Sequence, residues 1–199
     1  MSEIYNYPQI TPHTFVRFIL LRNFVFMDCF RTYTPTPALA PYILYYWMLD
    51  TSGGVSERVI PFGHVQLIFH REHSIFSSSH DELQPQCVIS GLSSGYTDRR
   101  TAGHVKMAVV AFRPEGARAF LNIPMQLFRN DNISVDDLED KPLRQLGRQL
   151  CTENDDLRCI QMIENFFLKR LENFDTYNLR RILPAIHTIN HDNHISISD

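Results

Sequence analysis

Short segments rich in aromatic and β-branched residues fill the first half of this 199-residue chain, and they constrain its fold more than any other feature. Clusters of Gly, Pro or Ser separate the segments, for example at residues 51–54 and 77–79, as expected for strands joined by turns. Several short strands at this spacing predict a β-barrel or a β-sandwich. The expected strands are Tyr42–Asp50, Glu57–Phe62, His64–His70, Cys87–Leu92 and His104–Arg113.

The segment 114–175 has the spacing of helices instead of strands. Pro114 suits the first turn of a short helix, because the N–H that proline lacks has no partner there. Ser134 stands three residues before Asp137, a weak variant of the capping box that opens the next helix. The polar run 154–156 can cap a longer helix, whose apolar side chains at helical spacing are Leu157, Ile160, Ile163, Phe167 and Leu171. A β-rich half followed by a helical half predicts the α+β fold class.

These patterns divide the chain into three regions. The predicted regions are an N-terminal extension (1–34), a main domain (35–175, β-rich over 35–113 and helical over 114–175) and a final segment (176–199). The extension has two explanations. It is either an extra strand or amphipathic segment that lies on the main domain, or a stretch upstream of a natural start at Met27.

Composition and charge are those of an ordinary globular protein, without a bias toward nucleic acid or membrane. The formal net charge is −3, so the chain as a whole does not attract DNA. The apolar run 14–27 is interrupted by Arg17 and Arg22, and it is shorter than the roughly 20 residues of a membrane span. We therefore expect a cytoplasmic protein with no membrane partner. The cysteines, which lack a C-x-x-C spacing and fit a reducing compartment, are Cys29, Cys87, Cys151 and Cys159.

The predicted strand His64–His70 has two different faces. Its apolar face carries Val65, Leu67 and Phe69, whereas the opposite face carries His64, Gln66, Ile68 and His70. The second face is polar enough to line a pocket or to meet water.

Several short motifs occur in an informative order along the chain. They are Pro37-x-Leu39, Tyr46-Trp47, the run ERVIPFG from Glu57 to Gly63, Leu67-Ile68-Phe69, and Phe112-x-Pro114-x-Gly116-Ala117. In this order they resemble the N-terminal sensing domain of one branch of the AraC-type bacterial transcription regulators. The resemblance covers roughly residues 33–172, and ERVIPFG is its most specific piece.

The resemblance implies a cupin-like barrel that binds a small-molecule effector, forms a homodimer and controls an attached DNA-binding domain. Residues 179–190 and 195–199 look like the first helix of that domain and the entry to its second helix. Neither recognition helix is present, so contact with DNA is expected only through a missing C-terminal domain. A shortened reading frame and a shortened expressed chain explain this equally well.

The strand pattern and the resemblance together give a set of expected ligand contacts, namely Trp47, Arg58, His64, Gln66 and His70. Trp47 either stacks on a ligand or belongs to the core. Arg58 either contacts the ligand or holds a turn through charge-assisted hydrogen bonds. In the branch, acidic residues commonly stand at the positions of Phe62 and Gln66, and this departure puts any ligand-binding function of those positions in doubt.

The sequence lacks the motifs of metal-dependent and other enzymes. Metal-dependent cupin enzymes use two histidines one residue apart, and here Gln66, a poor transition-metal ligand, stands where the second would be. His64, His70 and His104 therefore lack the required spacing. The chain also lacks the nucleophile elbow, the P-loop and the dinucleotide fingerprint. We expect no metal, no other cofactor and no enzymatic activity.

The apolar helix face from Leu157 to Leu171 has two possible partners: the chain's own barrel, or the same helix of a second copy. The resemblance favours the homodimer. Two alternatives to a sensing domain stay open, a metal-dependent cupin-type enzyme and a ligand-free interaction module with a filled barrel. A cavity on the order of a few hundred cubic ångströms would favour sensing over the interaction module.

Overall fold

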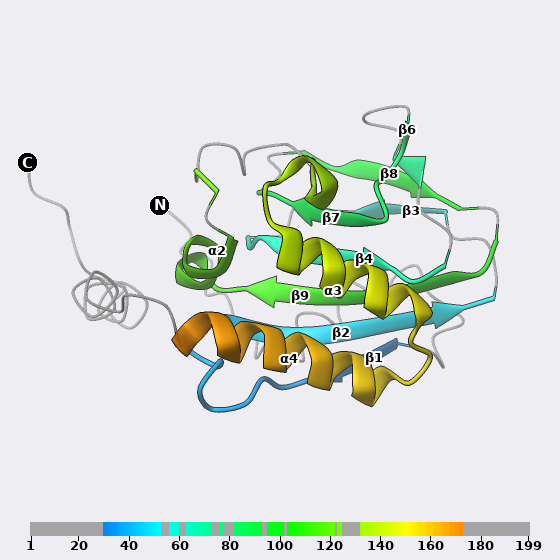
Figure 1. Ribbon diagram of the computed structural model, residues 1–199. Helices are drawn as coiled ribbons and strands as arrows, with labels where there is room; N and C mark the ends of the chain where they lie inside the picture. The colour runs from blue at the N-terminus through cyan, green and yellow to red at the C-terminus, as the bar shows by residue number, and fades with distance from the viewer. Residues whose placement is uncertain are drawn as a thin grey trace, which may run out of the picture.

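The computed structural model describes residues 30–172, apart from 53–55, 60–62, 73–75, 78–81, 93–94, 102, 122 and 125–131 (Figure 1). Some expectations lie outside the described residues. These are the start at Met27, Phe62, most of the N-terminal extension and the helical pattern in residues 176–199.

A six-stranded antiparallel sheet forms the centre of the domain, in the order β1-β2-β9-β4-β7-β10 (Figure 1). Its strands are β1 (Phe30–Tyr33), β2 (Ile43–Thr51), β4 (Gln66–His70), β7 (Cys87–Ser90), β9 (Val105–Phe112) and β10 (Asn132–Ser134). Strands β2, β4, β7 and β9 lie where the sequence predicts them, with ends that differ by one or two residues. Runs of aromatic and β-branched residues with flanking turn residues were therefore sufficient to locate the central strands.

The two edge strands differ from the expectation. Strand β1 lies in the region interpreted as an extension, but it pairs with β2 and places Thr32 opposite Trp47. For these residues the structure agrees with an extra strand that lies on the main domain. Strand β10 interrupts the segment expected to be helical, because Ile133 pairs opposite Ile89 of β7 and packs on the core.

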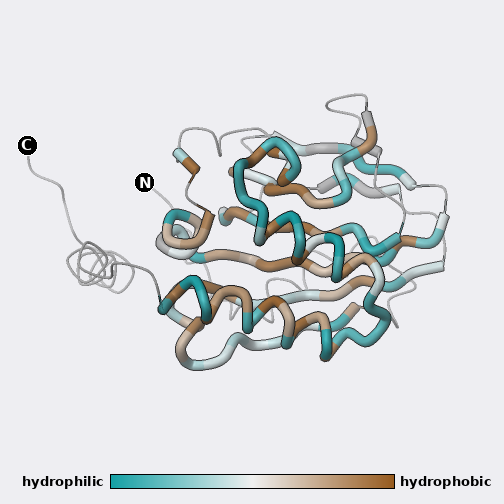
Figure 2. The backbone as a smooth tube through the Cα atoms, in the orientation of Figure 1, coloured by the Kyte–Doolittle hydropathy of each residue, from teal (hydrophilic) through white to brown (hydrophobic). Residues whose placement is uncertain are grey.

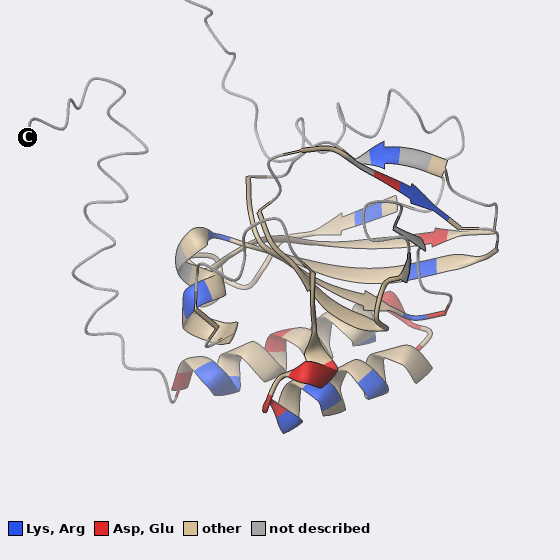
Figure 3. Ribbon diagram, turned by 90° about the horizontal axis from the view of Figure 1, so that it is seen from above, with Lys and Arg blue, Asp and Glu red and all other residues tan. Residues whose placement is uncertain are grey.

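A second, four-stranded sheet lies on the side of the larger sheet away from the helices (Figure 3). Its strands, in sheet order, are β3 (Ser56–Val59), β8 (Thr97–Arg100), β5 (Phe76–Ser77) and β6 (Glu82–Leu83). Strand β3 confirms the first part of the predicted strand Glu57–Phe62. Among the described strands the two sheets are not hydrogen-bonded to each other, and they do not close into a barrel.

The helices follow the strands, as predicted: α2 (Pro114–Leu121), the 3₁₀ turn η2 (Val135–Asp137), α3 (Lys141–Thr152) and α4 (Asp156–Glu172). Helix α2 begins at Pro114. Ser134 opens only the short turn η2, where its hydroxyl accepts a hydrogen bond from the Asp136 amide at 3.2 Å. The mixed composition of sheets and helices confirms the α+β class.

Aspartate side chains cap the two long helices. The Asp140 carboxylate accepts a hydrogen bond from the Leu143 amide at 3.0 Å and thereby starts α3. Within the polar run 154–156, Asp155 accepts from the Leu157 amide at 2.8 Å and caps α4. A carboxylate at each of these ends also interacts favourably with the helix dipole.

The main core lies between the helices and one face of the six-stranded sheet. Its sheet side is formed by residues such as Leu67, Phe69 and Val110, which are fully buried. Phe167 of α4 meets Phe112 of β9 edge to face, with ring centroids 5.5 Å apart. Figure 2 shows the central strands largely in the colours of hydrophobic residues, in agreement with a sheet covered on both faces.

Two ion pairs attach the ends of α4 to the rest of the fold. At its start, Asp156 meets Arg71, the residue after β4, with Oδ1 and Nη1 2.7 Å apart. Both side chains are buried, and Arg31 of β1 also reaches Asp156 Oδ2 at 3.2 Å. At the other end, Arg170 contacts the Asp140 cap of α3 at 2.6 Å and donates to the Phe120 carbonyl of α2. Charged groups therefore join all three helices.

Gly116 allows α2 to approach the sheet through a direct contact with backbone. A Cβ at this position would lie 1.9 Å from the Tyr42 carbonyl oxygen. The same carbonyl accepts a hydrogen bond from the Arg113 amide at 2.9 Å, and this bond fixes its position. The glycine of the Phe112–Ala117 motif is therefore required by packing.

The other face of the six-stranded sheet is apolar at its centre. Its buried cluster consists of Leu49, Ile68, Val88, Val105, Met107 and Val109, with Trp47 packed against it. We call this surface, which points away from the helices, the inner face. No helix in the described part of the chain is long and apolar enough to cross a membrane.

Candidate ligand-binding face

Strand register arranges the inner face in three rows across β2, β9, β4 and β7. The first row contains Tyr45, Ala111, Gln66 and Ser90. The second contains Trp47, Val109, Ile68 and Val88, and the third contains Leu49, Met107 and His70. Polar side chains thus lie at both ends of β4, and an apolar row separates them.

The first row forms a half-buried polar group around His64. The His64 Nε2 atom lies 3.1 Å from Gln66 Nε2 and 3.4 Å from the Tyr45 hydroxyl. Burial lowers the pKa of His64 to about 4 and raises the pKa of Tyr45 to about 12. Both side chains are therefore uncharged at neutral pH and can exchange hydrogen bonds with a neutral ligand.

The third row ends in a fully buried histidine. The main chain of His70 is held by a hydrogen bond from its amide to the Gln86 carbonyl oxygen at 2.8 Å. Neither ring nitrogen of His70 has a hydrogen-bond partner among the described residues, and the same is true of the amide atoms of the buried Gln84 nearby. Each such buried, unpaired group costs about 1–3 kcal/mol. Native proteins keep few of them, and these two side chains lie close enough to be each other's partner.

Electrostatics keep the His70 ring neutral. The pKa of His70 is lowered to about 4, mainly by burial; the charge of the nearby Arg99 guanidinium acts in the same direction, and the neighbouring Gln84 side chain acts in the opposite one. At neutral pH the ring therefore offers one donor and one acceptor. His70 cannot provide a positive charge for an anion under these conditions.

Trp47 lies in the middle row of the inner face, half-buried, next to the polar first row. Its ring contacts Phe30 of β1, with centroids 5.4 Å apart. Phe69 faces the helices instead, because it has the opposite parity on β4 from Ile68 and His70. The structure therefore brings together Trp47, His64, Gln66 and His70 on one face.

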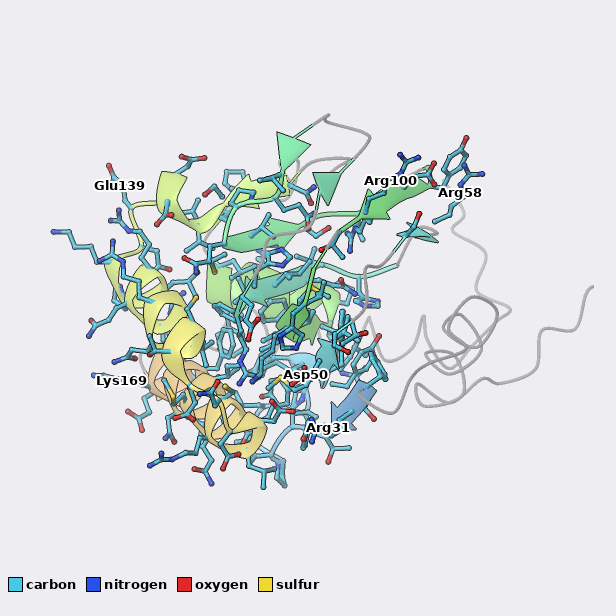
Figure 4. The ribbon with its side chains drawn as sticks, turned by 90° about the vertical axis from the view of Figure 1, so that its right-hand side faces the viewer. Arg31, Asp50, Arg58, Arg100, Glu139 and Lys169 are labelled. Atoms are coloured by element: carbon cyan, nitrogen blue, oxygen red, sulfur yellow. The ribbon has the colours of Figure 1, made fainter. Side chains whose placement is uncertain are left out.

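Arg58 lies elsewhere. It belongs to the smaller sheet, where its guanidinium contacts the Asp98 carboxylate through two hydrogen bonds of 2.7 and 3.0 Å. Its Cζ atom lies 4.1 Å from the Tyr96 ring centroid. The side chain is exposed, and Figure 4 shows it at the outer rim, away from Asp50 and Arg31. This arrangement agrees with the charge-assisted structural interpretation and separates Arg58 from the other expected contacts.

Most residues of the predicted dimer surface on α4 are buried within the chain itself. Ile160, Ile163 and Phe167 are buried against the chain's own sheet, and Leu171 packs partly against the same core. Only Leu157 is largely exposed, at 58%. Those three buried side chains are therefore unavailable for a helix seam between two copies in this structure, because intramolecular packing already covers them.

His104 directly precedes β9 and lies between two carboxylates. Its Nε2 atom is 2.6 Å from Asp50 Oδ1, and its Nδ1 atom is 2.7 Å from Glu72 Oε2. The described residues contain no group of three or more His, Cys, Asp or Glu side chains that could hold a metal ion. The hydrogen bond with Asp50 raises the pKa of His104, and the charge of Glu72 adds to this effect.

This contact predicts a small alkaline loss of stability. A protonated His104 stabilises the fold fully below its unfolded pKa of about 6.5, and the contribution disappears as the pH rises through the higher folded pKa. Burial alone would raise the pKa of Asp50, but His104 and Lys106 lower it, so its contribution is lost only in acid. Because His104 is partly exposed, we expect an effect under about 1 kcal/mol.

Urea unfolding of the wild type and of His104→Gln between pH 6 and pH 9 measures this contribution. His64 and His70, whose pKa values are lowered, lose stability in the opposite direction and are common to both proteins. The stability difference between the two proteins should therefore shrink as the pH rises. A difference independent of pH would contradict the charged contact.

Two polar residues, Tyr45 on the inner face and Gln84 close to it, were not among the expected ligand contacts. Tyr45 stands in a strand whose two faces are both apolar, so alternation could not assign it to one side. Gln84 stands in the polar stretch DELQPQ, which reads as a loop, and only tertiary folding brings it near His70. A hollow of about 500 Å³ lies apart from this face, lined by Lys141, Arg144, Gln145 and Arg148 on α3. It is open to solvent and contains no buried polar group, so we place the candidate site on the inner face.

Comparison with known proteins identifies the domain but not its activity. Residues 31–134 match a family described as a domain of unknown function, DUF6597. The match extends from β1 to β10 and includes every residue of the three rows. Neither the curated proteins nor the solved structures gave a match. Since the matched segment covers more than half of the 199 residues, the chain belongs to the DUF6597 family.

Proposed function

We propose that this domain is the sensing part of an AraC-type transcription regulator and that it binds a small-molecule effector on the inner face. The observation that carries the proposal is the group of uncharged polar side chains on an otherwise apolar, largely buried sheet face. Ligand sites in proteins typically combine apolar walls with a few placed polar groups. The order of the sequence motifs adds the AraC-type assignment by resemblance.

The arrangement of the two sheets supports the cupin-like part of the proposal. The smaller sheet lies over the inner face, and Arg99 of β8 is near enough to His70 of β4 to affect its pKa. A ligand between them would contact residues from both sheets. Self-association and control of a DNA-binding domain stay predictions of the resemblance, without a surface assigned to them.

Trp47, the only tryptophan of the chain, reports directly on this site. A panel of uncharged sugars, aromatic amides and nucleosides is screened by thermal unfolding and by Trp47 emission. At a concentration 100 times its Kd, a specific ligand adds about 2.7 kcal/mol of stability, which corresponds to a rise in Tm of about 5–10 °C. We expect at least one compound to raise Tm and to change Trp47 emission in a saturable way.

Two variants test where such a compound binds. Gln66→Leu removes an amide from the first row, whereas Arg58→Ala removes an exposed side chain from the outer rim of the smaller sheet. Binding should weaken about tenfold in Gln66→Leu, the loss of one hydrogen bond, and stay unchanged in Arg58→Ala. Equal binding to both variants, or no binding compound at all, would exclude the inner face as an effector site.

A further inference from the structure

Helix α3 carries three positively charged side chains on the side that points away from the core. Lys141, Arg144 and Arg148 follow one another at spacings of three and four residues, which places them in one stripe along the helix. Leu146 and Leu150 face the core on the opposite side. The helix contains neither Asp nor Glu, although the whole chain has a net charge of −3. Figure 3 shows the blue segments along this helix.

The charges of this basic stripe are not neutralised by the fold. None of its three side chains forms a hydrogen bond or an ion pair with another residue in the described part of the chain. Arg170 of α4, by contrast, is paired with Asp140. The stripe lines the solvent-open hollow on α3 together with Gln145. Its positive charge is therefore available to an external partner.

The other exposed side chains of α3 indicate which kind of partner fits. They are Pro142, Gln145, Gln149 and Thr152, so the exposed side has no large apolar side chain. Protein interfaces typically have an apolar core with aromatic anchors, and a helix that lies on a membrane needs a free apolar face. Neither feature is present on the exposed side of α3. Arg, Lys and Gln are, however, side chains that bond to the phosphate oxygens of nucleic acids.

We propose that the basic stripe of α3 binds the phosphate backbone of duplex DNA without reading its sequence. Arg144 and Arg148 can each form two parallel hydrogen bonds to a phosphate group, and Lys141 adds a point charge. With a rise of 1.5 Å per residue the stripe is about 10 Å long, the length of about three successive phosphates of one strand. This contact goes beyond the proposed effector site and lies on a different surface of the domain.

The turn before α3 limits the strength of this contact. Asp136, Asp137 and Glu139 are exposed there and would repel DNA, which is therefore held at the helix alone. The Kd should lie at the weak end of non-specific binding, on the order of 10⁻⁴ M at physiological salt. The choice of DNA as the source of phosphate rests on the proposed function. A DNA-binding domain on the same chain would raise the effective DNA concentration to roughly millimolar, so the stripe would strengthen the complex about tenfold.

The salt dependence of binding tests the proposal. The 199-residue chain is titrated into a short, fluorescently labelled DNA duplex, and the anisotropy gives the Kd at each salt concentration. Three neutralised phosphates predict a slope of log K against log salt of about −2.7, so the affinity should fall roughly fortyfold between about 50 and 200 mM salt. Two duplexes of unrelated sequence should bind equally, because phosphate contacts carry no sequence information.

Two double variants with the same loss of charge locate the contact. Arg144→Gln with Arg148→Gln removes two cations of the stripe, whereas Arg100→Gln with Arg118→Gln removes two exposed cations of β8 and α2. The first should reduce the size of the salt slope by about 2 and weaken binding at low salt at least about tenfold. The second should leave the slope unchanged. Thermal unfolding by circular dichroism checks that both variants keep the wild-type fold.

The possible outcomes separate this proposal from its alternatives. No binding at low salt, equal losses in the two double variants, or a preference for one duplex sequence would each overturn it. Polyglutamate that competes as well as unlabelled duplex, charge for charge, would indicate an acidic protein segment as the partner and would overturn it as well. The effector proposal is independent of these results, because it depends on uncharged compounds whose binding requires Gln66 on the inner face.

Discussion

Gly116→Ala should lower the free energy of unfolding by about 3 kcal/mol or more, although alanine is the better helix former. The new Cβ would lie 1.9 Å from the Tyr42 carbonyl oxygen and 2.6 Å from its carbon. Backbone cannot move aside as a flexible side chain can. Helix α2 would have to separate from β2, and the contacts of Phe120 with Tyr42 and Phe112 would weaken.

Gly147→Ala is the matched control within α3. There the added Cβ would meet Cys87 Cβ at 3.4 Å and Sγ at 3.5 Å, which are ordinary van der Waals distances. Removing a glycine from a helix interior then stabilises the protein by about 0.5–1 kcal/mol. Urea unfolding of both variants, followed by circular dichroism, measures the contrast. Similar effects of the two substitutions would show that α2 does not dock on Tyr42 as described.

Asp156→Ala is the second variant with a large expected effect, a loss of about 3–5 kcal/mol. It leaves the Arg71 guanidinium, whose side chain is 1% exposed, without its carboxylate. Arg71 would retain its bond to the Glu153 carbonyl oxygen at 2.5 Å, but that group does not neutralise its charge. The start of α4 would also lose its connection to Arg31 of β1.

Two comparisons separate the buried charge from general damage. Asp98→Ala breaks the exposed pair with Arg58 and should change the stability far less, because solvent screens an exposed ion pair. The double variant Arg71→Met with Asp156→Leu replaces both charges by apolar groups and should recover most of the lost stability. Chemical unfolding of the three proteins measures this order. A double variant as unstable as Asp156→Ala would mean that the loss comes from packing and not from an unpaired charge.

Periodicity predicted the parts of the fold that local sequence determines. Runs of aromatic and β-branched residues between turn residues located β2, β4, β7 and β9, and Pro114 marked the first residue of α2. Strand β1 agrees with one of the two explanations of the N-terminal region, whereas β10 was missed; each is held by pairing with a distant strand, β1 with β2 and β10 with β7. Such short segments have no period of their own.

In the candidate site, too, only the features that depend on local sequence were predictable. Alternation along His64–His70 correctly grouped Gln66, Ile68 and His70 on one face, because parity on a single strand is a local property. Arg58 belongs to the other sheet, and sequence does not show which of two sheets a strand joins. Gln84 was missed for the same reason, because a loop residue has no periodicity to place it.

Helix α4 shows that sequence periodicity cannot identify the packing partner of an apolar helix face. Its spacing was compatible with a core or with a dimer seam, and both require the same pattern of side chains. Only the tertiary structure shows that Ile160, Ile163 and Phe167 face the sheet. The predicted helix was correct, but only the tertiary structure identifies the surface against which it packs.

The proposal that the inner face receives a small molecule is tested most directly by NMR. The compound that raises Tm most in the thermal screen is titrated into the ¹⁵N-labelled chain, in which the single indole N–H signal belongs to Trp47. We predict saturable shifts of that signal and of the amides of Gln66, Ile68 and His70. Shifts confined to α3 and α4, with the Trp47 signal unchanged, would contradict a ligand site on the inner face.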